Sequence, residues 1–220
     1  MKSKQTPAQE TSLRKYFYGN QVEREEVISV QRPEMQELMR DLNKVKQNTV
    51  NLFSILFSDL SHTSGKMRTN PDDQFWRRMT IRALAAGVDG IVYCLKQNAL
   101  IGGKISGYKF NDGEFIFLSE ESIDTKTGKK PRLPVFRENM KQMFNLFYKI
   151  HNISCPTDFG HVGFNALCET YELRHRLMHP KSFFTFCVND EEKRKAGEAV
   201  AWLNEEIKKL LDSCGDNVGK

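Results

Sequence analysis

Apolar residues recur at steps of three and four positions along much of this chain, and that period is typical of amphipathic α-helices. The first such stretch begins at Pro33, a residue well suited to the first turn of a helix. We expect the run His62-Thr63-Ser64-Gly65 to end it. Its apolar face is formed by Met35, Leu38, Met39, Leu42, Val45, Thr49, Phe53, Leu56 and Leu60. The sequence therefore predicts a long helix within residues 31–66, preceded by a mobile arm over residues 1–30.

The run Asn70-Pro71-Asp72-Asp73 predicts the start of a second long helix. It combines a capping asparagine, a proline at the first helical position and two acids near the positive end of the helix dipole. The residues that follow, to about Asn98, are apolar on several sides, which is the pattern of a central, buried helix. Asp89 lies within this helix. Gly87 and Gly90 beside it would let another helix approach closely.

Residues 103–133 have a different pattern. Tyr108 and Phe110 alternate with polar residues, the run 111–113 (Asn-Asp-Gly) is a turn signal, and Phe115 and Phe117 alternate again. This pattern predicts a β-hairpin inserted between helices. The glycine-rich stretch 101–107 lacks the spacing of a phosphate-binding loop, so we interpret it as the segment leading into the hairpin.

Three further helices complete the predicted fold. One runs from Pro134 to Ile150, a second covers residues 161–178, and a third follows a cap at Asn189-Asp190-Glu191-Glu192 and ends before Gly215. The predicted fold class is all-α: a helical bundle with one inserted hairpin, in which residues 67–215 form the main domain.

Composition sets limits on the class of protein. Hydrophobic residues make up 39% and charged residues 28% of the chain, as in an ordinary soluble globular protein. No apolar run approaches the length of a membrane span, and the N-terminus does not resemble a signal peptide, so we expect a cytoplasmic protein. The five cysteines form no CxxC pair, which favours reduced thiols over a zinc knuckle or a redox motif. The net charge of +5 is compatible with a polyanionic partner.

Arg174 stands out on the helix predicted over 161–178. It shares a helical stripe with Phe164, Leu167, Cys168, Tyr171 and Met178. An arginine on an apolar stripe is costly unless another group pairs with it, which suggests a specific task. His179 precedes Pro180, so the helix should end there. Histidine is the side chain best suited to general acid–base chemistry near neutral pH.

Arg174, the polar His175, three further residues ending at His179, and Pro180 resemble the R-x4-H signature of the HEPN superfamily of helical-bundle ribonucleases. The resemblance covers roughly residues 70–213. It implies RNA cleavage without a metal or cofactor, in which the 2′-hydroxyl of the RNA attacks the adjacent phosphorus. His179 would act as general acid or base, and Arg174 would bind the phosphate.

The same resemblance implies supporting residues and partners. His175 fits the second position of the motif, Arg176 lies next to it, and Asp89 is our candidate for the acidic residue that orients Arg174. Members of the superfamily commonly dimerise so that two motifs line one cleft. The resemblance therefore implies a homodimer acting on RNA, as a toxin or an antiviral-defence effector, with an antitoxin or sensor protein as a further partner.

Three other interpretations of the motif remain. His175 and His179 have the spacing of a zinc pair, but Arg176 stands where the zinc proteases need a glutamate. In a purely structural interpretation, the two arginines pair with Glu169 or Glu172 while His179 caps the helix. In the third, the chain is an inactive HEPN-like bundle that binds a protein or RNA.

Residues outside the motif have weaker signals. The cations of the loop over 124–134 either hold the RNA backbone or are simply solvated: Lys126, Lys129, Lys130 and Arg132. Three aromatic residues follow the motif, and we favour packing against the last helix or a dimer partner over stacking on bases: Phe183, Phe184 and Phe186. Three isolated histidines are expected at the surface or at helix caps: His62, His151 and His161.

Overall fold

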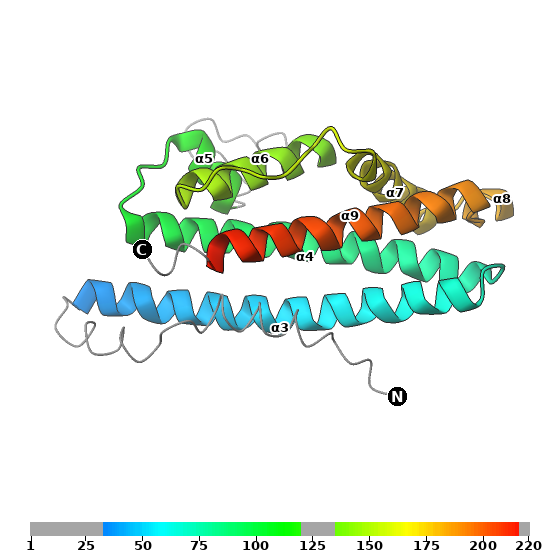
Figure 1. The fold of residues 1–220 in the computed structure, drawn as a ribbon, viewed down its shortest axis with the longest axis horizontal. Helices are drawn as coiled ribbons and strands as arrows, with labels where there is room; N and C mark the ends of the chain where they lie inside the picture. Colours follow the sequence, from blue (N-terminus) through cyan, green and yellow to red (C-terminus); the bar gives the residue numbers. More distant parts are fainter. Residues whose placement is uncertain (1–32, 120–134, 216–220) are drawn as a thin grey trace. The chain divides into compact units, whose positions relative to one another are not determined.

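The computed structural model describes residues 33–119 and 135–215, and every regular element in these ranges is a helix (Figure 1). The elements are α3 (Pro33–Thr69), α4 (Gln74–Ser106), α5 (Asp112–Ser119), α6 (Phe136–Ile150), α7 (Val162–Met178), α8 (Phe183–Phe186) and α9 (Asp190–Gly215). The all-α prediction is confirmed. None of the helices in the described ranges is long and apolar enough to cross a membrane. The predicted arm over 1–30 and the basic loop from Lys126 to Arg132 lie outside the described residues.

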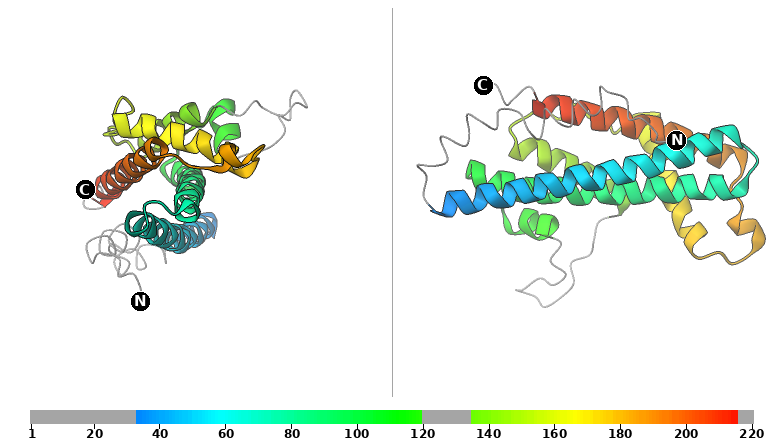
Figure 2. Two further views of the ribbon diagram at one scale, coloured as in Figure 1. Left: turned by 90° about the vertical axis from the view of Figure 1, so that its right-hand side faces the viewer. Right: turned by 90° about the horizontal axis from the view of Figure 1, so that it is seen from below.

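The described chain forms two compact units. One contains residues 51–91 and 156–215, and the other contains residues 33–50, 92–119 and 135–155. Both long helices, α3 and α4, contribute to both units. In each unit a part of α3 lies alongside a part of α4 (Figure 2): Leu56 fits against Gly90 in the first, and Asn98 donates a hydrogen bond to Thr49 in the second.

The predicted end of the first long helix and the predicted start of the second are both wrong. The helix α3 continues through 62–65 to Thr69. Thr63 is compatible with the helix because its hydroxyl donates to the carbonyls of Asp59 and Leu60 in the preceding turn. Met67, one turn later, is buried and holds the helix end against the core. The helix α4 begins at Gln74, since it is the carboxylate of Asp73 that accepts a hydrogen bond from the Phe75 amide, at 2.8 Å.

The predicted β-hairpin is also wrong over the described residues, 103–119. Gly107 has a left-handed φ of +71° and ends α4, and the Tyr108 amide bonds back to the Gly103 carbonyl at 2.8 Å. Asn111 then begins α5 through a reciprocal cap: its side chain accepts from the Glu114 amide at 2.8 Å, and Glu114 accepts from the Asn111 amide at 3.1 Å. The Asn-Asp-Gly run is thus a helix start. The remainder of the predicted hairpin, 120–133, lies outside the described residues.

The three helices predicted between residues 134 and 215 are confirmed, and each begins within two residues of its predicted start. His161 caps α7 by accepting a hydrogen bond from the Gly163 amide at 3.0 Å, which agrees with the capping role expected for an isolated histidine. Asn189 caps α9 through a reciprocal pair of bonds with Glu192. The helix α7 packs closely along α9, because a Cβ atom on Gly163 would lie only 2.4 Å from Trp202.

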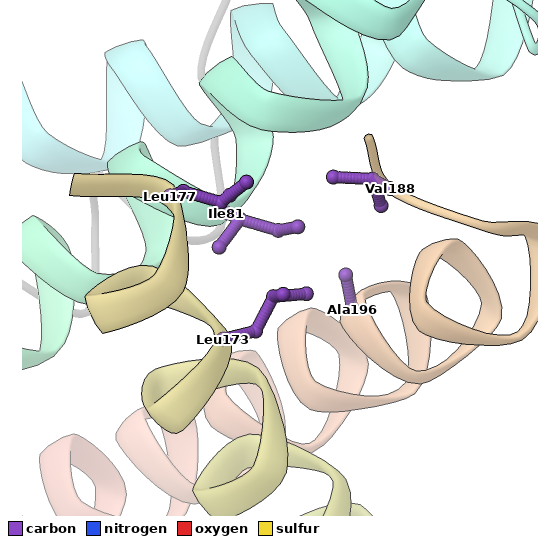
Figure 3. Close-up of a cluster of buried hydrophobic side chains, with 5 residues drawn as sticks. All are labelled: Ile81, Leu173, Leu177, Val188 and Ala196. Atoms are coloured by element: carbon purple, nitrogen blue, oxygen red, sulfur yellow. The ribbon is translucent and has the colours of Figure 1, made fainter. Parts of the chain in front are cut away.

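A small apolar cluster fixes the C-terminal end of α7 (Figure 3). It consists of Ile81 from α4, Leu173 and Leu177 from α7, Val188 and Ala196. All five are at most 9% exposed, and Phe186 packs against them. Since the cluster brings together α4, α7, α9 and the segment before α9, it holds the residues at the end of α7 in a defined position.

In the other unit, His151 lies at the C-terminal end of α6, and the centroid of its ring is 4.5 Å from the centroid of the Phe147 ring. The space for it is provided by Gly102, where a Cβ atom would lie 2.8 Å from the imidazole. Its Nε2 atom is buried and has no hydrogen-bond partner among the described residues. Burial, and secondarily the positive charge of Lys46, lower the pKa of His151 below its ordinary value of 6.5.

Stability is therefore expected to fall on mild acidification. In the unfolded chain His151 takes up a proton more readily than in the folded one, so its contribution is complete above pH 6.5 and decreases as the pH falls through the lowered pKa. The slope from this one residue is at most about 1.4 kcal/mol per pH unit. Urea denaturation between pH 7.5 and 5.5 measures it. His151→Gln should flatten the profile, whereas the same substitution at the exposed His62 should not; equal slopes in all three proteins would contradict the assignment.

Candidate functional site at the end of helix α7

Arg174 lies one turn from the end of α7 with its side chain 33% exposed. Its Nη2 atom is 3.7 Å from the Oδ2 atom of Asp89, which is on α4. At that distance the two charges attract each other without a hydrogen bond. Within the described residues the guanidinium of Arg174 donates no hydrogen bond, so its planar fork can bind an incoming anion. The sequence prediction paired these two residues, and the structure places them together.

Tyr171 connects the members of this pair. Its hydroxyl donates a hydrogen bond to the Oδ1 atom of Asp89 at 2.7 Å, and its ring lies 5.7 Å from the guanidinium carbon of Arg174. The ring also contacts His175 edge-on, with centroids 6.0 Å apart. Burial and the hydrogen bond to Asp89 raise the pKa of Tyr171 to about 12. Tyr171 therefore remains a protonated donor at neutral pH and fixes the carboxylate that faces Arg174.

The sequence pattern places Tyr171 only on the apolar stripe and does not indicate its hydrogen bond to Asp89. The available signal was its position three residues before Arg174, which puts the two side chains on one face of the helix. Arg82 was missed as well: it lies on α4 and donates a hydrogen bond from Nη2 to the Leu177 carbonyl at 3.2 Å. This contact satisfies one of the last carbonyls of α7 and adds a cation at the helix end.

His179 lies immediately after α7, as predicted from Pro180. Its backbone has left the helical region (φ −129°, ψ 61°), and its amide donates to the His175 carbonyl at 3.1 Å. The side chains of His179 and His175 are both exposed. An exposed imidazole at a fixed backbone position can exchange protons with a bound substrate or with water, as general acid–base chemistry requires.

Arg176 has a structural role. Its Nη2 atom donates to the Cys187 carbonyl at 2.9 Å and to Glu192 at 3.0 Å, which ties α7 to the first turn of α9. Neither arginine pairs with the partners expected in the purely structural interpretation, since Glu169 binds Lys195 and Arg174 faces Asp89. That interpretation is wrong in its partners, although His179 does stand at the helix end.

The three phenylalanines after the motif separate into two kinds. Phe186 packs against the apolar cluster, and the guanidinium of Arg78 lies over its ring at 4.2 Å. Phe183 and Phe184 are 76% and 83% exposed. The expected packing is therefore found for one of the three.

In the part of the chain that the structure describes, no three His, Cys, Asp or Glu side chains are grouped so that they could hold a metal ion. Comparison of the chain with family models, curated proteins and solved structures finds no match. The functional interpretation therefore depends on the side chains at the end of α7. These are an arginine held by a carboxylate, a tyrosine that fixes this carboxylate, and an exposed histidine beyond the helix end.

Proposed function

We propose that this protein is a metal-independent endoribonuclease of the HEPN type. The observation that supports the proposal is the pairing of Arg174 with Asp89, whose carboxylate accepts a hydrogen bond from Tyr171. The exposed His179 follows at the end of the same helix, α7. A guanidinium fork that can bind phosphate, in the last turns of α7, and an imidazole on the residue that follows the helix are the two components that internal transesterification of RNA needs.

In the proposed reaction a base removes the proton of a 2′-hydroxyl, and the oxygen attacks the adjacent phosphorus. The bond from phosphorus to the 5′-oxygen breaks, and an acid protonates that oxygen. The products are a 2′,3′-cyclic phosphate and a free 5′-hydroxyl. His179 acts as acid or base, and the guanidinium of Arg174 stabilises the charge that builds on the phosphoryl oxygens.

A single imidazole in one protonation state cannot fill both roles in the same step. We therefore propose a homodimer in which His179 of each copy contributes to one composite site, with His175 in support. In the cell such an enzyme would serve as a toxin or an antiviral-defence effector, and an antitoxin or sensor protein would control it.

The test is incubation of the purified full chain with RNA in EDTA. The expected result is cleavage that leaves cyclic-phosphate and 5′-hydroxyl ends, and resistance of a substrate with a 2′-deoxy sugar at the cut site. RNA binding without turnover would contradict the proposal and would favour the non-catalytic binding module. Ends with a 5′-phosphate would indicate attack by water and would also contradict it.

Asp89 provides a test of how the site is positioned. Asp89→Asn keeps an acceptor for the Tyr171 hydroxyl but removes the charge that holds Arg174, so cleavage should fall by up to about 100-fold. Initial rates at saturating RNA measure this, with circular dichroism to verify the fold. The matched control is Glu169→Gln, which neutralises a carboxylate on α7 that pairs with Lys195 and should leave the rate unchanged. A wild-type rate in Asp89→Asn would show that Asp89 has no positioning role.

A further inference from the structure

Phe183 and Phe184 are the two most exposed large apolar side chains in the described residues, at 76% and 83%. They lie in α8, only a few residues beyond His179. Their ring centroids are 5.8 Å apart with an interplanar angle of 77°. A pair of adjacent phenylalanine rings left in water next to a candidate active site indicates a surface that binds another molecule.

The backbone beneath these rings is held in place from both sides. Ser182 and Thr185 form a reciprocal cap, in which the Ser182 hydroxyl accepts from the Thr185 amide at 3.2 Å and the Thr185 hydroxyl accepts from the Ser182 amide at 2.9 Å. Phe186, at the other end of α8, packs against the apolar cluster. The two outward rings are thus displayed on a fixed turn, which lowers the entropic cost of using them for binding.

The charge around α8 favours a polyanionic ligand. Arg78 and Arg82 lie 4.2 Å and 5.9 Å from the centre of the Phe186 ring, and Lys181 immediately precedes the cap. Within the described residues none of these three cations forms an ion pair, while the nearby carboxylate of Glu192 is already engaged by Arg176.

We infer that Phe183 and Phe184 form a stacking platform for unpaired RNA bases, on which the strand is held beside His179. The inference deepens the proposed function and depends on it for the identity of the ligand. Bases within a duplex have both faces covered, so only an unpaired base can lie on a phenylalanine ring. The two rings are nearly perpendicular and offer separate faces, while the neighbouring cations attract the phosphates.

Binding is measured by fluorescence anisotropy with the full chain and a labelled, fully 2′-O-methylated RNA strand, which has no 2′-hydroxyl to react. Alanine at both Phe183 and Phe184 should weaken binding of the single strand by about 5- to 150-fold for each base that stacks. Affinity for the same sequence as a duplex should not change. Phe184→Trp should retain single-strand affinity, whereas Phe184→Leu, equally apolar but not aromatic, should lose it.

Phe75→Ala is the matched control, because it removes another exposed phenylalanine, 51% exposed at the start of α4, and should not alter affinity. Unchanged single-strand affinity in the Phe183 and Phe184 variants would overturn the platform, even if the protein cleaves RNA. Aromatic-dependent binding without cleavage would support the platform and reject the nuclease. Sedimentation of each variant completes the test: an affinity loss that follows dissociation into monomers would assign these rings to a protein interface and overturn the inference.

Discussion

Replacement of His179 by alanine is expected to reduce metal-free RNA cleavage by about 10²- to 10⁴-fold, the usual contribution of a positioned general acid or base. The imidazole is exposed just beyond the end of α7. Among the described residues only the backbone amide of His179 forms a hydrogen bond, to the His175 carbonyl, so the truncation should leave the fold intact. Cleavage of a defined RNA in EDTA, with thermal unfolding as the check on folding, measures the effect. Cleavage at the wild-type rate would reject His179 as the acid–base group.

Arg174 supplies the companion experiment. Arg174→Ala should lower the rate by about 10²- to 10³-fold, as expected for loss of a group that stabilises transition-state charge. Arg174→Lys keeps the charge but loses the planar fork, so it should recover little of that rate if the guanidinium binds the phosphate through two hydrogen bonds. Arg194→Ala is the control, because its guanidinium pairs only with carboxylates on its own helix among the described residues. Full activity in Arg174→Lys would point to a generic anion contact.

The parts of this fold that could be predicted are those that depend on periodicity. A stripe of apolar residues every three or four positions requires a helix to bury it, and this holds for α3, α4, α6, α7 and α9. Helix boundaries failed where one residue suits two structures. Asn111 begins turns and caps helices equally well, and only the reciprocal bond with Glu114, three residues later, favours the helix.

The candidate site could be predicted in part for a similar reason. An arginine on an apolar stripe needs a partner, and the resemblance to the R-x4-H motif suggested Asp89 on the central helix, which the structure places 3.7 Å away. Tyr171 and Arg82 could not be assigned, because aromatic and basic side chains on helices usually serve packing and solvation. Their roles here depend on which face of α4 meets α7, and one sequence does not specify that contact.

Among the substitutions proposed for stability, replacement of Arg77 is expected to lower the free energy of unfolding the most. It lies near the start of α4, 5% exposed, and its guanidinium donates to the Val188 carbonyl at 2.9 Å and the Pro71 carbonyl at 2.6 Å. It also pairs with Asp190 and Asp72, but these carboxylates are 81% and 99% exposed and contribute little through charge alone. The important interactions are the buried hydrogen bonds to two backbone carbonyls.

Arg77→Ala should therefore lower the free energy of unfolding by about 1–3 kcal/mol for each buried carbonyl that loses its donor. Arg77→Lys should recover only part of this loss, because an ammonium group lacks the fork that reaches both carbonyls. Urea denaturation of these variants, with the exposed Arg68→Ala as control, measures the difference. A loss below about 1 kcal/mol in Arg77→Ala would show that the two reciprocal hydrogen bonds between Gln74 and Val188 suffice to hold this segment.

The Arg77 contacts also bear on the site, because Val188 belongs to the apolar cluster beneath the end of α7. Arg77 and Arg176 donate hydrogen bonds to two adjacent carbonyls in the segment before α9, those of Val188 and Cys187. Combining Arg77→Lys with Arg176→Lys should therefore destabilise the protein by an amount different from the sum of the single effects, since the two share a segment. Additive losses in a double-mutant cycle would mean that the two arginines act independently, and that the position of α8 beside His179 does not depend on their joint action.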